Sequence, residues 1–114
     1  MMPRAGRLTS TAEFRRAYAH GRRIDAGDIV AHILSTGRRR PARIGVAASK
    51  TVGGAVRRNL AKRRLREAVR AVDMPLGEGV DAVFAATPTT ARADFQNLVD
   101  KVRSALSEAG VFCA

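Results

Sequence analysis

The sequence has very little of the chemistry on which protein-borne catalysis usually depends. Its 114 residues include one cysteine and two histidines, and its ten acidic residues are scattered singly along the chain. The lone Cys113 can form neither an internal disulfide nor a zinc site, and a reduced cytoplasm is the expected compartment. Neither His20 nor His32 is spaced to pair with the other or with a carboxylate. No acidic pair suggests a two-metal nuclease centre, so no catalytic residue is expected in the protein.

Aromatic residues and long apolar runs are also scarce. The aromatic set is Phe14, Tyr18, Phe84, Phe95 and Phe112, so the core must consist mainly of aliphatic side chains. No apolar run is long enough to cross a bilayer, and no secretory signal precedes the first expected helix, so no membrane partner is expected. A hydrophobic fraction of 46% still supports a folded chain.

Acidic charge is outweighed about twofold by basic charge. Twenty-one Lys and Arg residues face ten acidic ones, which gives a formal net charge of +11. Such a charge repels itself in the compact state, so an anionic partner that neutralises it is the natural inference. All the basic residues except Lys50, Lys62 and Lys101 are Arg, whose planar fork of donors suits phosphate. Nucleic acid is the favoured partner. An anionic membrane surface is the competitor, but it is disfavoured because the chain has no Trp and the basic segment 55–72 has only a narrow, alanine-rich apolar stripe.

Hydrophobic periodicity and turn residues predict one α+β domain, residues 1–114, with a small mixed sheet. Residues 1–8 look like a flexible basic arm. Ser10 and Glu13 fit a capping box, and the helix that it opens is expected to end at His20 before Gly21. Strands are expected at 22–25, 28–34, 43–50 and 79–87, and helices at 55–72, ended by Pro75, and at 94–109, with Phe95, Leu98, Val102 and Leu106 inward.

The expected helix 55–72 is the strongest functional signal in the chain. Arg and Lys dominate residues 56–70, and Glu67 is their only acid. Like charges one turn apart destabilise a bare helix, whereas phosphates laid across them would be bound with release of counterions. A solvated face that keeps the domain soluble is the plainer alternative. On a helical wheel, one stripe is apolar (Ala61, Leu65, Ala68, Val69 and Val72) and a second is polar (Asn59, Arg63, Arg66 and Arg70, with Lys62 alongside).

Three motifs make the chain similar to a known family. The run Arg58-Asn59-Leu60-Ala61-Lys62-Arg63 with Arg66 resembles the Arg-Asn-Arg-x-Lys-Arg-x-x-Arg signature of the bacterial ribonuclease P protein component. Leu60 departs from it, because the family has Arg there. The segments Gly54-Ala55-Val56 and Ser49-Lys50 also resemble the family, as does Glu13-Phe14 followed by Tyr18-Ala19-His20-Gly21.

The resemblance implies both a fold and a mechanism. The fold would be an α-β-β-β-α-β-α sandwich, related to a domain of a ribosomal protein, with a mixed sheet and a left-handed βαβ crossover. The chain would be the protein subunit of an endoribonuclease whose catalytic centre lies in an RNA subunit and uses Mg²⁺ bound mainly by that RNA. Its partners would be this RNA and precursor tRNA, whose 5′ end is matured, with no small-molecule substrate. A non-enzymatic ribosomal or RNA-assembly protein of related fold is the alternative.

The resemblance also suggests which residues contact RNA. The 5′ leader of precursor tRNA would lie in a cleft with Phe14, Tyr18 and His32, although plain core packing also explains the two aromatics and a strand position explains the histidine. No protein group is expected to bind metal directly, but a hydrated Mg²⁺ could lie near Asn59. The candidate RNA-binding residues are Lys50, Arg57, Arg58, Asn59, Lys62, Arg63, Arg64, Arg66 and Arg70. The loop Arg38-Arg39-Arg40 is either a further phosphate contact or solvated charge.

Overall fold

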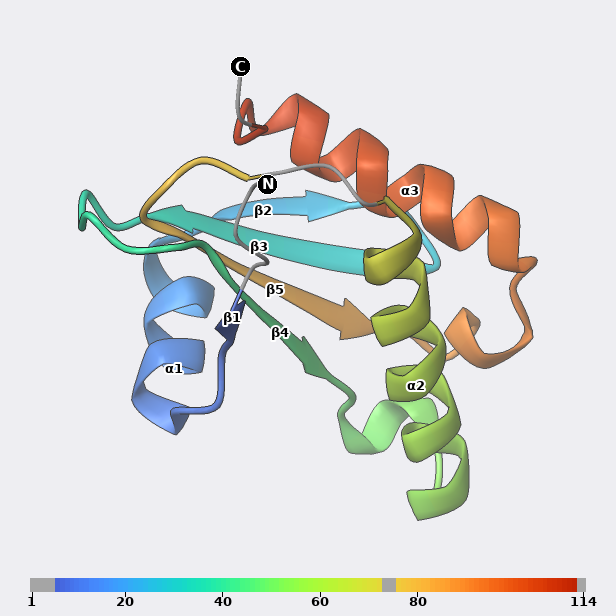
Figure 1. The fold of residues 1–114 in the computed structure, drawn as a ribbon. Helices are drawn as coiled ribbons and strands as arrows, with labels where there is room; N and C mark the ends of the chain where they lie inside the picture. Colours follow the sequence, from blue (N-terminus) through green and yellow to red (C-terminus); the bar gives the residue numbers. More distant parts are fainter. Residues whose placement is uncertain (1–5, 73–75, 113–114) are drawn as a thin grey trace.

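A five-stranded sheet carries one helix on one face and two on the other (Figure 1). The computed structural model describes residues 6–72 and 76–112, so Pro75 and Cys113 lie outside the described part. Its elements are β1 (Gly6–Arg7), α1 (Thr11–His20), β2 (Arg22–Asp25), β3 (Ile29–Ser35), β4 (Arg43–Ala47), the 3-10 helix η1 (Lys50–Val52), α2 (Ala55–Val72), β5 (Val80–Ala86), the 3-10 helix η2 (Thr90–Arg92) and α3 (Phe95–Glu108).

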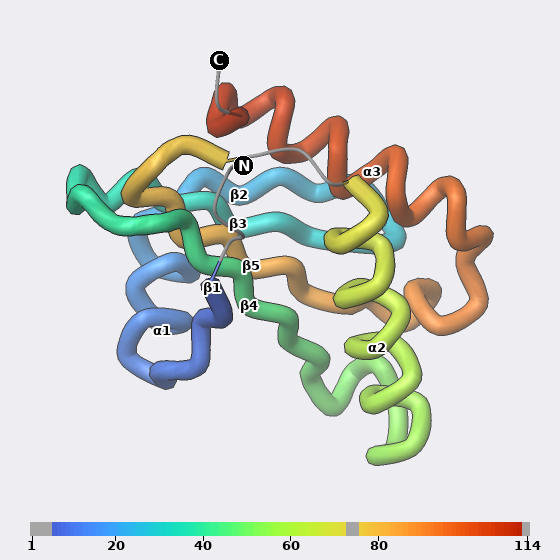
Figure 2. The backbone as a smooth tube through the Cα atoms, viewed as in Figure 1, coloured from blue at the N-terminus to red at the C-terminus, as the bar shows by residue number. Residues whose placement is uncertain are grey.

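The sheet is mixed, as expected, with the order β1-β4-β5-β3-β2. β5 lies at its centre, parallel to β4 and antiparallel to β3, while β2 and β3 form an antiparallel hairpin. A central strand faces other residues on both sides, and the apolar sequence of β5 is buried along almost its whole length. The chain passes from β4 through η1 and α2 to its parallel neighbour β5 (Figure 2).

Alternate residues of the strands feed two separate cores. Phe84, Ile29 and Leu65 belong to the larger core, between the sheet and helices α2 and α3. The smaller core lies under α1 and contains Leu8, Ala17 and Val83. Because α1 is short, its side of the sheet is covered less completely than the α2–α3 side. No helix in residues 6–72 and 76–112 is long and apolar enough to cross a membrane.

Residues 6–8 do not belong to a flexible arm, contrary to the expectation for residues 1–8. Gly6 and Arg7 pair with β4 as a short parallel strand, and the side chain of Leu8 is only 3% exposed. The reason is a long-range contact, since Leu8 packs in the core under α1 and its backbone N–H donates to the Ile44 carbonyl at 2.9 Å. Residues 1–5 lie outside the described part.

The prediction of a capping box at the start of α1 is wrong, although the helix begins and ends where expected. Ser10 is the N-cap, but its side chain makes no capping hydrogen bond. The Glu13 carboxylate is instead paired with Arg43 and with Arg40, the latter at 3.5 Å. Gly21 ends the helix in extended backbone, and a Cβ there would lie 2.5 Å from the Ala17 carbonyl oxygen. Close approach, rather than a left-handed turn, therefore requires this glycine.

Two other expectations differ from the structure. β4 ends at Ala47, so Lys50 begins η1 instead of closing the strand. Phe95 is 38% exposed, whereas Leu98, Val102 and Leu106 of the same helix are buried as expected. Phe95 is the first residue of α3, whose first turn projects beyond the strand ends (Figure 1), so the sheet does not lie opposite it.

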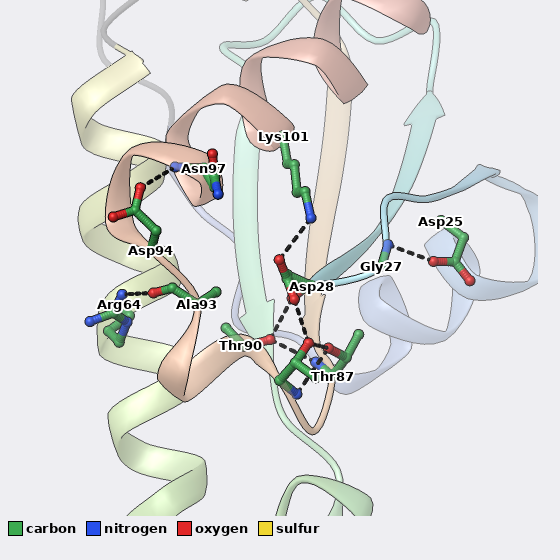
Figure 3. Close-up of polar contacts among 11 residues, drawn as sticks. Asp25, Gly27, Asp28, Arg64, Thr87, Thr90, Ala93, Asp94, Asn97 and Lys101 are labelled. Carbon is green, nitrogen blue, oxygen red and sulfur yellow. Dashed lines mark hydrogen bonds and ion pairs between the residues drawn. The ribbon is translucent and has the colours of Figure 1, made fainter.

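Asp28 joins the β2–β3 turn to the segment before α3 (Figure 3). Its carboxylate accepts from Lys101 Nζ at 2.7 Å and from the Thr89 hydroxyl, and its carbonyl accepts from the Thr90 hydroxyl. The hydrogen bonds from Lys101 and Thr89 lower the pKa of Asp28. This cluster is distant in sequence from the basic helix and serves to fix the fold.

Candidate nucleic-acid interface

The basic residues of α2 are held outward because the opposite face of the helix is buried. Ala61, Leu65, Ala68 and Val72 are all buried in the larger core, which fixes the rotation of the helix. We define the basic stripe as the polar residues on the outer side of α2. Its exposed members are Asn59, Arg63 and Arg70, and its half-buried members are Arg58, Lys62 and Arg66.

The charge of the basic stripe is not neutralised from within the part of the chain that the structure describes. Every ion pair among the described residues involves basic residues of other elements, and none involves α2. A half-buried arginine or lysine can keep its cationic end in water while its carbon stem is covered. The stripe can therefore bind a chain of phosphates without first breaking an internal ion pair.

Arg64 differs from its neighbours. Its Nη2 donates a hydrogen bond to the Ala93 carbonyl, which ties α2 to the segment before α3 (Figure 3). Its Nε is buried and has no partner among the described residues. This guanidinium is thus engaged within the fold, unlike that of Arg63.

Lys50 and Arg57 lie at the turn that leads into α2. Lys50 and Arg57 are both exposed. Gly53 has φ +138°, and a Cβ there would lie 2.9 Å from Arg57 Cδ. The chain therefore turns sharply at Gly53, and only glycine fits there without strain or displacement of Arg57. The backbone N–H of Arg58 donates to the Gly54 carbonyl at 2.9 Å, which begins the helix.

The three arginines of the loop Arg38-Arg39-Arg40 have two different environments. Arg40 and Arg43 pair with the buried carboxylate of Asp81 at 3.5 and 3.2 Å, and both also pair with Glu13. These contacts bind α1 to the beginnings of β4 and β5 in the sheet on which it lies. Arg38 and Arg39 are exposed, so only these two of the three loop arginines keep the roles expected from sequence.

The candidate leader residues lie on the α1 side of the sheet: Phe14 and Tyr18 on α1, and His32 on β3 in a row that crosses the strands. The register places Arg23, His32, Val83 and Gly45 side by side on β2, β3, β5 and β4. α1 lies over this row. Phe14 packs so closely on Gly45 that a Cβ there would lie 2.5 Å from its Cζ. Phe14 therefore packs against the smaller core of Leu8, Ala17 and Val83, which is the core-packing alternative for this residue.

Tyr18 and His32 form the more open part of this site. Their ring centroids are 4.6 Å apart at an interplanar angle of 79°, and Tyr18 is 42% exposed. Burial raises the pKa of Tyr18. Burial and the nearby positive charge of Arg23 lower the pKa of His32, which favours the neutral imidazole. The pair thus presents two uncharged rings beside a cation.

Beside the row of strand residues under α1, the sheet has a second row, made of small half-buried residues. The register aligns Val30, Ala85 and Ala47 across β3, β5 and β4, and each is only half-buried. We call these three residues the floor row. It runs across the sheet, and β4 leads from it through Ser49 to Lys50 and the start of α2 (Figure 2). The floor row thus lies between the row under α1 and the segment that leads from β4 to the start of α2.

Sequence reasoning missed Arg23 and the floor row. Both follow from pairing, since the hairpin of residues 22–25 with 29–35 places Arg23 opposite His32. A register for that hairpin would have found Arg23, but the floor row needs the non-local pairing of β5 with β3 and β4. Within the described residues, no three His, Cys, Asp or Glu side chains lie together as metal ligands.

Known proteins are similar to this chain along nearly its whole length. The family described as Ribonuclease P matches residues 2–110. A protein named ribonuclease P protein component from Gluconacetobacter diazotrophicus is 42% identical, over 97% of each chain. One of the same name from Roseiflexus sp. is 40% identical, over 99% of this chain and 93% of the relative.

Solved structures agree on the fold. The Staphylococcus aureus RNase P protein superposes with a TM-score of 0.78 and 24% identity, over 96% of this chain and 100% of that one. The RNase P protein from Thermotoga maritima gives a TM-score of 0.71 and 25% identity, over 90% and 96%. With the signature residues on the outer side of one helix and the family matched from residue 2 to 110, the chain belongs to the ribonuclease P protein family.

Proposed function

We propose that this chain, as the protein subunit of ribonuclease P, binds the RNA subunit along the basic stripe and the 5′ leader of precursor tRNA beside α1. One observation carries the proposal: on the outer side of α2 lies a row of basic side chains that no described acid neutralises. Phosphate contacts would stabilise such a row and would release condensed counterions. We include Lys50, Arg57, Arg58, Asn59, Lys62, Arg63, Arg66 and Arg70 and omit Arg64 because of its bond to Ala93.

The α1 side of the sheet has the chemistry to hold a single strand. Proteins that bind single strands with little sequence preference combine aromatic stacking with a basic track for the backbone. Tyr18 and His32 would offer the rings, Arg23 the adjacent cation, and the floor row an apolar surface of low relief. Phe14 would hold α1 against the sheet beside this surface, because it packs on Gly45. Leader nucleotides leaving the floor row would pass Lys50 toward α2.

Hydrolysis itself would belong to the RNA subunit, with Mg²⁺ supplying the Lewis acid when bound. Asn59 fits an indirect role, since its exposed amide can donate to or accept from a water molecule of a hydrated ion. The cellular compartment would be the cytoplasm, where precursor tRNA is matured.

Reconstitution tests this function directly. The chain is mixed with the ribonuclease P RNA of its own organism and with precursor tRNA, and 5′ cleavage is followed at low Mg²⁺. We expect the protein to accelerate cleavage strongly there, because its cationic surface takes over part of the charge neutralisation that Mg²⁺ otherwise provides. No effect on cleavage, together with tight binding to ribosomal RNA, would favour a ribosomal or assembly role instead.

A further inference from the structure

The outer side of α2 carries an apolar patch that the basic stripe does not explain. Val56 is 85% exposed and Leu60 is 37% exposed, two of only four large hydrophobic side chains this exposed among the described residues. They are four residues apart on one helix, so they lie on the same face. Gly53 and Gly54 leave a shallow hollow beside them, also lined by Ala55 and Arg57. We call Val56 and Leu60 the apolar patch.

The surroundings of the apolar patch are basic. Asn59 and Arg63 lie one turn away on the same helix, and Arg57 lines the hollow. Glu67 is the only acid of α2 and lies two turns beyond Leu60. A second copy of this chain would bring another +11 of charge toward the same surface, so self-association through the patch is opposed by repulsion. Charge complementarity favours a polyanion.

A nucleic acid carries both kinds of surface that would complement the apolar patch and its basic surroundings. Its phosphates match the arginines, and the faces of its bases are apolar. Leucine and similar side chains cover or wedge against bases in many nucleic-acid complexes. Leu60 also stands where the family signature has Arg, so at this position the chain replaces a phosphate-type contact by an apolar one.

We propose that Val56 and Leu60 contact the face of an unpaired nucleobase in the RNA that lies along the basic stripe. The inference rests on the proposed function, because it needs RNA on that stripe. It assigns the patch a contribution to affinity that is independent of ionic strength, whereas each arginine contributes through counterion release. Salt dependence therefore separates the two kinds of contact.

The experiment compares charge-preserving variants across a salt series. Dissociation constants for the organism's own ribonuclease P RNA, transcribed in vitro, are measured at several KCl concentrations for wild type, Val56→Ser and Leu60→Gln. We expect the affinity extrapolated to 1 M salt to fall roughly threefold to thirtyfold for each variant, as apolar contact area is lost. The log–log salt slope should stay unchanged, because no charge is removed.

Two further variants sharpen the comparison. Ala71→Ser alters an exposed apolar residue of the same helix that lies about 22 Å from Val56 along the axis, and it should leave both parameters unchanged. Leu60→Arg restores the family signature, and it should steepen the slope by about one while lowering the affinity extrapolated to 1 M salt. Since Val and Ser, and Leu and Gln, have similar helix propensities, denaturant melts should remain close to wild type.

The possible outcomes are distinct. Unchanged affinity at all salt concentrations for both Val56→Ser and Leu60→Gln would overturn this inference while leaving the proposed function intact. Loss of wild-type self-association in sedimentation, with RNA affinity unaffected, would also overturn it and assign the patch to a protein contact. Absence of wild-type binding to the RNA would overturn both proposals together.

Discussion

Tyr18 and Phe14 lie one turn apart on α1, yet they have different surroundings. Phe14 fills the space that Gly45 leaves open and packs with Leu8 and Val83. Tyr18 meets the edge or face of His32 and keeps 42% of its surface exposed. One aromatic therefore contributes mainly to folding, while the other is able to meet a ligand.

This difference gives a prediction for leader binding. Tyr18→Ala should weaken binding of precursor tRNA by about 1–3 kcal/mol, the range measured for loss of one base stack. Mature tRNA, which has no leader, should bind almost as well to the variant as to wild type. The measurement is a pair of dissociation constants on one variant. Equal losses for both tRNA forms would place the leader elsewhere.

Phe14→Ala serves as the matched control on the same helix. It should lower the free energy of unfolding by up to about 3 kcal/mol, because it opens a cavity over Gly45. Tyr18→Ala should leave the denaturant midpoint much closer to wild type, since surface substitutions usually change stability by about 0.5 kcal/mol or less.

His32 should make the free energy of unfolding depend on pH. Its pKa in the folded chain is lowered from 6.5 by burial and by Arg23, so the unfolded chain takes up the proton first as the pH falls. Stability should therefore decrease below about pH 6.5, and the decrease should stop below the folded-state pKa. Chemical melts at pH 7 and pH 5 measure this, and His32→Gln should show a smaller difference between them.

Asp28 titrates in a separate window and provides the control. Its pKa is lowered from 3.8, so its stabilising hydrogen bonds with Lys101 and Thr89 are lost only as the pH falls through that lower value. Asp28→Asn should consequently leave the difference between pH 7 and pH 5 intact. If His32→Gln also left it intact, the burial of the imidazole would not control stability in this range.

At the scale of the element, α2 shows how far the sequence determines local structure. The periodicity within it and Pro75 after it predict a helix over 55–72 and its buried stripe, and the structure has both. These signals are local, because they depend on backbone freedom and on residues three or four apart. The same periodicity could not separate Arg63 from Arg64, because the Ala93 carbonyl that engages Arg64 comes from a distant segment.

The start of the chain shows where local signals fail. Ser10 and Glu13 match a capping box, but a carboxylate next to the cations of Arg40 and Arg43 gains more from these ion pairs than from a backbone N–H. β1 exists only because β4 is adjacent, and nothing in residues 6–8 alone predicts that pairing. Residue type alone was therefore enough to select the candidate site residues. Which of them are buried, which are hydrogen-bonded within the fold and which are exposed to solvent depends on tertiary contacts.

Arg63 and Arg64 form a matched pair of adjacent arginines that tests this sorting. Arg63→Ala should lower the log–log salt slope of RNA binding by about one, with stability changed by about 0.5 kcal/mol or less. Arg64→Ala should instead lower the free energy of unfolding by about 1–2 kcal/mol, because the Ala93 carbonyl loses its charged donor. The measurements are salt-dependent binding and denaturant melts of both variants. A reversed result would mean that Arg64 is the phosphate contact.

At the scale of the whole molecule, the charge is divided between folding and binding. Arg40, Arg43 and Lys101 neutralise Asp81, Glu13 and Asp28 inside the described fold. The basic residues of α2 face no such partners there, so most of the net charge of +11 is available to an external polyanion. Within the described residues, no three His, Cys, Asp or Glu side chains gather as they would in a protein-borne metal site for phosphodiester cleavage.

The last prediction follows from that division and concerns catalysis by the protein alone. Purified chain freed of RNA by nuclease treatment and repurification should not cleave precursor tRNA at any Mg²⁺ concentration. Among the described residues, no three His, Cys, Asp or Glu side chains lie together as metal ligands, and Asp81 and Asp28 are paired with Arg40 and Lys101. Addition of the ribonuclease P RNA should restore cleavage. The assay resolves the 5′ leader product on a gel, and a nuclease-treated control confirms that no RNA remains. Robust cleavage that persists in the RNA-free protein and survives repurification would require a protein-borne active site, and the assignment of hydrolysis to the RNA subunit would then be wrong.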